Sequence, residues 1–186
     1  MFASDDFVVG PGPAWQVTTP PGTAQGEGTN AADAFLTLST SGGTFDLWQG
    51  TKTVPRALQA MPDADFALEA RFLSAPSRAF QMQGFLVEAG GDTWLRFDTF
   101  HDGTTLRAFG AITVAGQTTA VFNTPIAAGA APYLRLERSG DTFVLRHSQD
   151  GESWTEAGRA TRAVTVTEAG VFAGSVGAGS AFTAQV

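Results

Sequence analysis

Aromatic and planar polar side chains gather in two stretches of this sequence. A flat aromatic ring can stack on the apolar face of a pyranose. Amide, carboxylate and guanidinium groups can bond its hydroxyls or a uronate carboxylate. The residues that combine these properties, and that we take as candidate ligand-binding residues, are Trp48, Arg56, Gln59, Gln83, Trp94, Arg96 and Asp98.

Strand parity decides which of these side chains can act together. On a strand over 93–100, alternation puts Trp94, Arg96 and Asp98 on one face, which is too polar for a core. On a neighbouring strand over 80–88, Gln81 and Gln83 share a face, and they would lie beside Trp94 if the two strands pair. The alternative is that the polar residues only solvate the outside of the fold and that Trp48 or Trp94 is a core tryptophan.

Other chemistries find less support in the sequence. There is no cysteine, and the two histidines are not at metal-ligand spacing, so neither zinc nor a hydrolytic triad is indicated. The Glu-x-Asp-x-x-Glu arrangement that brings two carboxylates onto one strand face is missing, and we therefore expect no enzyme. A structural Ca²⁺ held by Asp5 and Asp6, by Asp63 and Asp65, or by Asp92 is the one metal considered.

The elements that must position these residues are predicted to be β-strands. Apolar and polar residues alternate over short stretches that Gly, Pro, Asn and Asp punctuate. The pattern predicts strands near 35–38, 45–48, 66–72, 80–88, 93–100, 104–114, 117–122, 133–138, 142–148, 154–159 and 169–176. Pro11 to Asn30 is predicted to be irregular, Trp15 to close an end of the fold, and Trp154 to be core. Many short strands joined by turns are typical of an all-β sandwich or barrel.

Composition narrows the classes of partner. The 186 residues carry 18 acidic and 11 basic side chains, a formal net charge of −7, so nucleic acid is not expected to bind. No apolar run approaches the roughly 20 residues of a membrane helix. We expect one domain over 1–186, and the alternating end from Ala181 to Val186 suggests a piece excised from a longer chain.

Several motifs together resemble a known family. They are Asp5-Asp6-Phe7, Leu47-Trp48-Gln49-Gly50, Pro55-Arg56-Ala57-Leu58-Gln59, Gln83-Gly84-Phe85-Leu86-Val87, Thr93-Trp94-Leu95-Arg96 and Tyr133-Leu134-Arg135-Leu136-Glu137-Arg138. Their order and spacing resemble the concanavalin A-like, laminin-G-like β-sandwich modules of secreted bacterial glycoside hydrolases, including the C-terminal module of β-xylosidase-type enzymes. The resemblance implies a jelly-roll sandwich of two curved antiparallel sheets, an extracellular or cell-surface setting, and carbohydrate recognition or support of an enzyme.

The sequence therefore predicts a non-catalytic carbohydrate-binding or accessory module of a larger secreted bacterial protein. Its expected partners are a polysaccharide and other domains of the parent chain, with no required cofactor beyond a possible structural Ca²⁺. Two other functions remain open, a structural or adhesive spacer of a surface protein and a glycoside hydrolase or lyase of the same fold.

Overall fold

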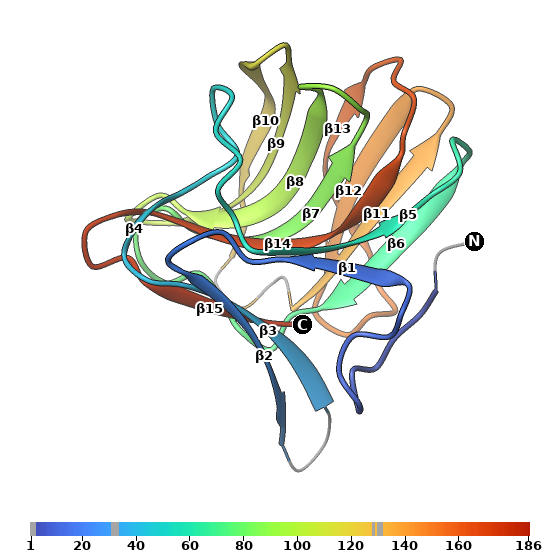
Figure 1. The fold of residues 1–186 in the computed structure, drawn as a ribbon. Helices are drawn as coiled ribbons and strands as arrows, with labels where there is room; N and C mark the ends of the chain where they lie inside the picture. The colour runs from blue at the N-terminus through green and yellow to red at the C-terminus, as the bar shows by residue number, and fades with distance from the viewer. Residues whose placement is uncertain (1–2, 31–33, 128, 130–131) are drawn as a thin grey trace.

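The computed structural model describes residues 3–30, 34–127, 129 and 132–186. Their secondary structure consists of strands in three sheets (Figure 1). The strands are β1 (Trp15–Thr18), β2 (Thr23–Thr29), β3 (Ala34–Thr40), β4 (Gly43–Phe45), β5 (Arg56–Ala60), β6 (Phe66–Arg71), β7 (Gln81–Glu88), β8 (Trp94–His101), β9 (Leu106–Val114), β10 (Gln117–Pro125), β11 (Tyr133–Ser139), β12 (Thr142–Ser148), β13 (Thr155–Thr161), β14 (Glu168–Gly177) and β15 (Phe182–Gln185). Within the described residues, no helix has the length and hydropathy needed to cross a membrane.

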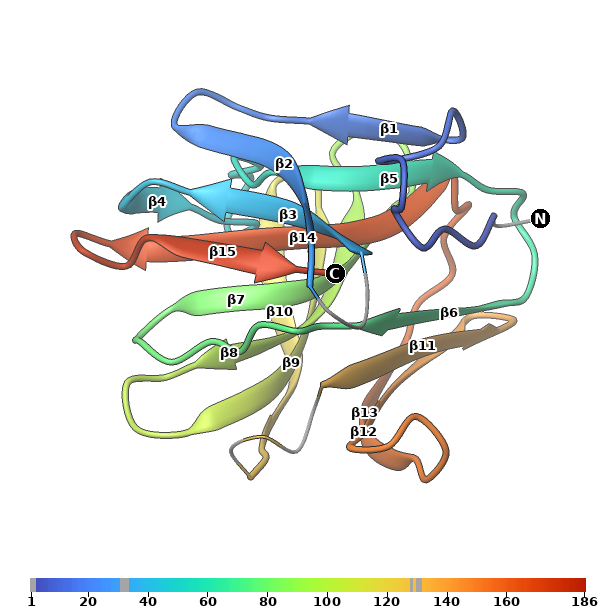
Figure 2. The same ribbon diagram turned by 90° about the horizontal axis from the view of Figure 1, so that it is seen from below.

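One large sheet forms the first layer of a sandwich. It has eight strands in the order β1-β5-β14-β7-β8-β9-β10, with β4 pairing to β14, and it is open because β1 and β10 are its edges. A four-stranded sheet, β13-β12-β11-β6, and a three-stranded sheet, β15-β3-β2, lie over one of its faces (Figure 2). All pairings between these strands are antiparallel. The predicted all-β sandwich is thus confirmed.

The main core fills the space between the layers. Alternation supplies it, as in β11, where Leu134 and Leu136 are fully buried and their neighbours are only half-buried. Phe85 of β7 and Phe97 of β8 reach the same core from the large sheet. Phe97 stacks on Phe143 of β12 at 5.8 Å between ring centroids, which joins the two layers directly.

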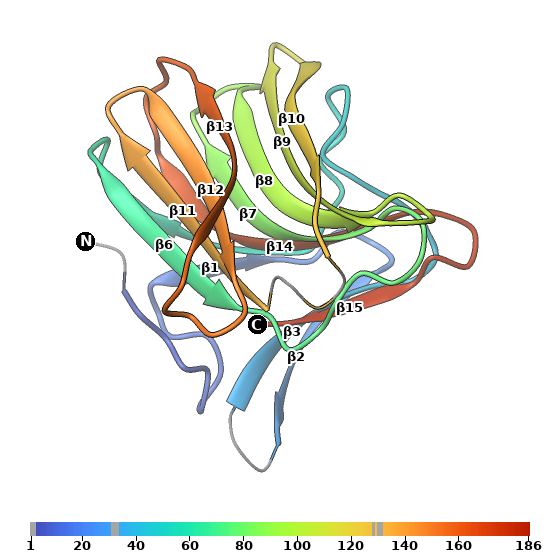
Figure 3. The same cartoon turned by 180° about the vertical axis from the view of Figure 1, so that it is seen from behind.

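The opposite face of the large sheet is also partly covered. Strands β7, β8 and β9 bend, and the segment 46–55 lies inside that bend, on the side away from β6, β11 and β12 (Figures 1 and 3). This concave outer face carries a second apolar cluster, which consists of Leu47, Val54, Leu58, Met82, Leu86, Trp94 and Phe172. Strands β7 and β8 are therefore buried on both faces.

Three details of the fold correct the predictions. The stretch 11–30 is not irregular, because β1 and β2 fall within it and pair with β5 and β3. The strand expected over 45–48 ends at Phe45, so Trp48 lies on a loop. Trp154 is not core, since it is half-buried on the outside of the four-stranded sheet with the Arg135 guanidinium 5.0 Å from its ring.

Candidate functional site

The segment 46–55 covers one end of the concave face. Leu47 and Val54 anchor it, because both are fully buried against the large sheet. A backbone hydrogen bond from Thr53 N to Asp46 O closes the segment on itself. The amide of Gln49 donates to Thr118 Oγ1 of β10 at 2.9 Å, which ties the tip to the sheet edge. The segment is therefore a fixed part of the fold.

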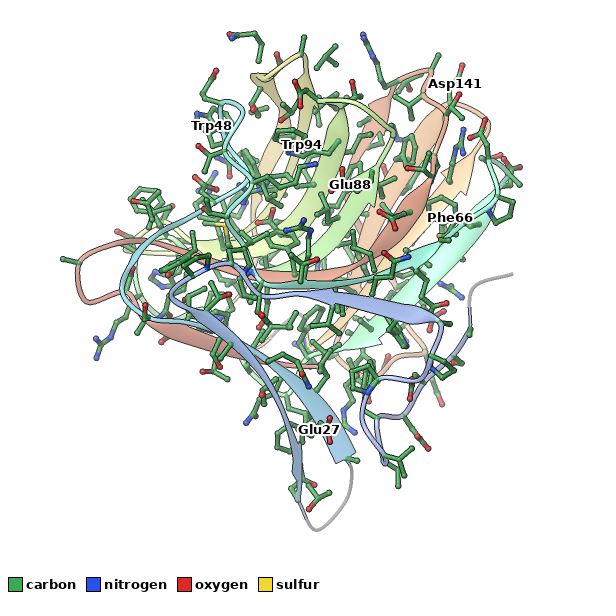
Figure 4. The ribbon with its side chains drawn as sticks, viewed as in Figure 1. Glu27, Trp48, Phe66, Glu88, Trp94 and Asp141 are labelled. Carbon is green, nitrogen blue, oxygen red and sulfur yellow. The ribbon has the colours of Figure 1, made fainter. Side chains whose placement is uncertain are left out.

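Trp94 lies beneath this cover. Its side chain is only 2% exposed, and the Lys52 ammonium sits 4.5 Å from the centre of its ring. Lys52 in turn forms an ion pair at 2.7 Å with Glu88, which is labelled near Trp94 in Figure 4. The expectation of an exposed Trp94 ring that stacks on a sugar is wrong, because segment 46–55 turns a polar-looking sheet face into a second core.

Arg96 and Asp98 form a buried ionic cluster with Asp46 on the same face. Arg96 Nε donates to Asp98 Oδ2 at 2.7 Å, and Nη1 donates to Asp46 Oδ1 at 2.9 Å. The guanidinium also lies 5.1 Å from the ring of Phe109 and 5.7 Å from that of Phe172. Strand parity correctly predicted that Arg96 and Asp98 share one face of the sheet. The structure shows that the two side chains bond to each other.

Burial sets the ionisation of this cluster. Burial raises the pKa of Asp98 above its ordinary value, although the Arg96 charge opposes the rise. Asp98 Oδ1 is buried and has no hydrogen-bond partner among the described residues, which agrees with a carboxylate that is poorly solvated. Burial alone would lower the pKa of Arg96, but Asp98 and Asp46 together raise it. The cluster carries no net positive charge.

The other end of the concave face is open and forms a pocket of about 310 Å³. Its walls combine aromatic rings, two further apolar side chains and one ion pair, and they are Asp46, Trp48, Phe80, Met82, Arg96, Phe100, Phe109 and Val176. Trp48 is 36% exposed and Phe80 is 48% exposed. The Trp48 ring tilts against Phe109 at 6.3 Å, so its position is supported from one side. The pocket thus offers exposed aromatic rings over a buried Arg96.

The structure separates the remaining candidates from this pocket. Arg56 shares the concave face, but it lies outside the pocket lining and donates to Val54 O. Gln59 points to the core side, where its amide exchanges two hydrogen bonds with the backbone of Ala3.

Gln83 also points away from Trp94. It pairs in register with Thr99, whereas Trp94 pairs with Glu88 at the other end of the strand. Its side chain bonds Ser74 through both the hydroxyl and the carbonyl. The expectation that Gln83 sits beside Trp94 is wrong. The prediction assumed only that the two strands pair, which sets neither the register between them nor the sheet face on which Gln83 lies.

Sequence reasoning missed much of the pocket lining. Phe100 shares parity with Trp94, Arg96 and Asp98, and extending that count by two residues would have found it. Phe109 pairs with Asp98 in register, which no local pattern gives. Phe80 precedes β7 in a turn, and only the folded backbone shows where its ring lies.

Several of the acidic residues considered for Ca²⁺ have other partners. Asp63 accepts hydrogen bonds from Arg138 Nη1 and Val166 N, and Asp65 accepts one from Gly140 N. Asp5 accepts from the amides of Phe7 and Gly12. Over the described ranges, no three His, Asp or Glu side chains gather in a way that could hold a metal ion. The structural Ca²⁺ stays a prediction.

Comparison with known proteins identifies structural neighbours. No family model and no curated protein matches the sequence. Among solved structures, the chain is similar to the GH43 protein BlXynB from Bacillus licheniformis, with a TM-score of 0.73 and 16% identity over 97% of this chain and 37% of that one. It is similar to GH43B of a Bacteroides ovatus xyloglucan PUL, with a TM-score of 0.69, 16% identity and the same coverages.

A shorter protein also shares the fold. A functionally unknown protein from Saccharomyces cerevisiae matches with a TM-score of 0.68 and 16% identity, over 92% of this chain and 90% of that one. The chain thus spans little more than a third of the GH43 proteins it matches and nearly all of the yeast protein. At these identities the comparisons show a shared β-sandwich, found in carbohydrate-active proteins and elsewhere.

Proposed function

We propose that this chain is a non-catalytic carbohydrate-binding or accessory module that binds a sugar at the open end of the concave face. The observation that carries the proposal is the pocket in which Trp48 exposes its aromatic ring beside the buried Arg96 guanidinium. An exposed ring of this size costs free energy in water unless something covers it. A pyranose ring supplies an apolar face for the indole and hydroxyls for the polar groups.

The charges favour an uncharged sugar. Arg96 is the cation of the pocket lining, and Asp46 and Asp98 already neutralise it. A uronate carboxylate would meet no net positive charge there, and it would lie close to Asp46. A neutral sugar can donate a hydroxyl hydrogen bond to Asp46 and accept one from the remaining Arg96 hydrogens. The uronate alternative raised by the sequence is therefore the weaker one.

The same lining supports a non-catalytic role. Glycosidases use two carboxyl groups that flank the scissile bond, about 5–9.5 Å apart. Among the described residues that line the pocket, Asp46 is the one carboxylate, and the nearby Asp98 is completely buried under Arg96. A glycoside hydrolase or lyase would need a second acid that reaches the ligand.

The proposal extends to the parent protein and to the class of polysaccharide. We further propose that the chain is a concanavalin A-like module joined to other domains in a larger, secreted bacterial protein, as the sequence resemblance implies; it spans 37% of each GH43 neighbour. One neighbour, the Bacteroides ovatus GH43B, is named after xyloglucan, so xyloglucan and related plant polysaccharides are the first ligands to try.

Affinity electrophoresis tests the proposal. Gels containing xylan, xyloglucan or β-glucan should retard the wild-type chain, and polygalacturonate should not. Trp48→Ala should abolish the retardation, while Trp154→Ala, which alters a half-buried tryptophan on the other layer, should leave it unchanged. Retardation that survives Trp48→Ala would place the site elsewhere, and a folded chain that no polysaccharide retards would favour a structural spacer.

A further inference from the structure

Phe80 adopts a backbone conformation that its side chain does not favour. Its φ is +59°, in the left-handed region that glycine and asparagine tolerate and bulky residues rarely enter. Gln81 N donates to Arg78 O, so Phe80 is the third residue of a four-residue turn. A turn that needs positive φ at this position normally has glycine there.

The surrounding structure holds Phe80 in this state. Its amide donates to His101 O at 2.7 Å, and its carbonyl accepts from Val176 N at 3.1 Å. The side chain of Gln81 accepts hydrogen bonds from the amides of Ser77 and Arg78, which fixes the turn from inside. Residues kept in such conformations by their surroundings cluster at functional sites.

Burial of the ring does not explain why phenylalanine occupies this position. The side chain is 48% exposed, so much of its apolar surface stays in water. Phe80 lines the same pocket as Trp48 and Arg96. The fold would accept glycine or asparagine at this turn with less strain.

We propose that Phe80 is a ligand-contacting residue of the sugar site, retained at a cost in stability because its ring forms a second stacking surface beside Trp48. This inference rests on the proposed function and deepens it, since it assigns a residue that the sequence pattern did not single out. In this proposal the turn 78–81 holds the Phe80 ring at the pocket.

Replacing Phe80 separates stability from binding. Phe80→Asn and Phe80→Gly should melt at the wild-type temperature or up to about 4 °C above it, because they relieve the strained φ. The same variants should weaken binding to the polysaccharide that retards the wild type by at least about tenfold, because a stacking ring is lost.

Ala115 supplies a matched control. It has φ +49° and precedes Gly116 in the two-residue turn between β9 and β10, and it is not part of the pocket lining. Ala115→Asn creates the Asn-Gly pair that this type of hairpin favours, so it should raise the melting temperature and leave binding unchanged.

The outcomes distinguish the two proposals. If Trp48→Ala abolishes binding but Phe80→Asn and Phe80→Gly retain it, the assignment of Phe80 is overturned and the sugar site stands. If the Phe80 variants instead melt more than about 4 °C below the wild type, the ring has a packing role and the inference also fails. A folded wild type that binds none of the polysaccharides overturns both proposals.

Discussion

Trp48 and Trp94 lie on one side of the same sheet, yet their surroundings are opposite. Trp94 is 2% exposed under Lys52, and Trp48 is 36% exposed at the mouth of a pocket. Figure 4 shows Trp48 on segment 46–55 and Trp94 at the start of β8. The difference arises from the segment, which closes one end of the concave face and leaves the other end open.

This contrast separates a supporting region from a binding region. The closed end packs Leu47, Val54 and Trp94 into a second core, which stiffens the curved sheet. The open end exposes the rings that a ligand could cover. Arg96 lies at the boundary, since it is buried with Asp98 and also lines the pocket.

Removing the guanidinium at this boundary should have the largest effect. Arg96→Met leaves Asp98 completely buried without its cation, and loss of one partner of a buried ion pair costs about 3–5 kcal/mol. Urea unfolding should show this loss. The double variant Arg96→Met/Asp98→Leu should recover most of it, and a single variant within about 1 kcal/mol of wild type would show that the pair is not needed.

The two tryptophans should then differ in stability. Trp94→Ala creates a cavity in the second core and should cost about 3 kcal/mol, the lower end for such substitutions because Lys52 can settle into the space. Trp48→Ala removes an exposed ring and should cost about 1 kcal/mol or less. The same urea measurement checks both, and equal losses would mean that segment 46–55 does not divide the face.

Two aspartates should differ in the direction of their pKa shifts. Hydrogen bonds from the amides of Ser153 and Glu152 hold the pKa of Asp150 well below its usual value, whereas burial raises that of Asp98. The contribution of Asp150 to stability is therefore present above pH 3.8 and lost as pH falls through its folded pKa. The contribution of Asp98 to stability is instead largest below the pKa of the unfolded state, and it is lost as pH rises through the higher pKa of the folded state.

A carbon-13 NMR titration of the aspartate carboxyl groups checks these directions. The Asp98 signal should titrate above pH 3.8 and the Asp150 signal below it. An Asp98 signal that titrates below the Asp150 signal would contradict the conclusion that the buried Asp98 carboxylate is poorly solvated.

The sequence predicted the sandwich well because alternation is a local property. Leu134 and Leu136 alternate with polar residues, and the core follows from that parity. Parity also placed Trp94, Arg96 and Asp98 on one face. It could not show that segment 46–55 folds back over that face, because the contacts of Leu47 and Val54 are non-local.

Register and turn geometry were equally inaccessible. Gln83 fell on the core side because β7 pairs with β8 in a register that no local pattern specifies. Phe80 entered the pocket through a turn that normally calls for glycine, so its own residue type argued against the conformation it adopts. The pocket is therefore where local rules and the fold disagree most.

The central claim is that the open end of the concave face binds an uncharged sugar and the closed end does not. The chain has four tryptophans, so nitrogen-15 NMR of the indole N–H groups can follow each of them during titration with xylohexaose, cellohexaose and laminarihexaose. We predict that at least one of these oligosaccharides shifts the Trp48 signal and that the Trp94 signal moves least of the four. The claim would be contradicted if none of the three oligosaccharides shifted the Trp48 signal. A shift at Trp15 or Trp154 larger than the shift at Trp48 would also contradict it.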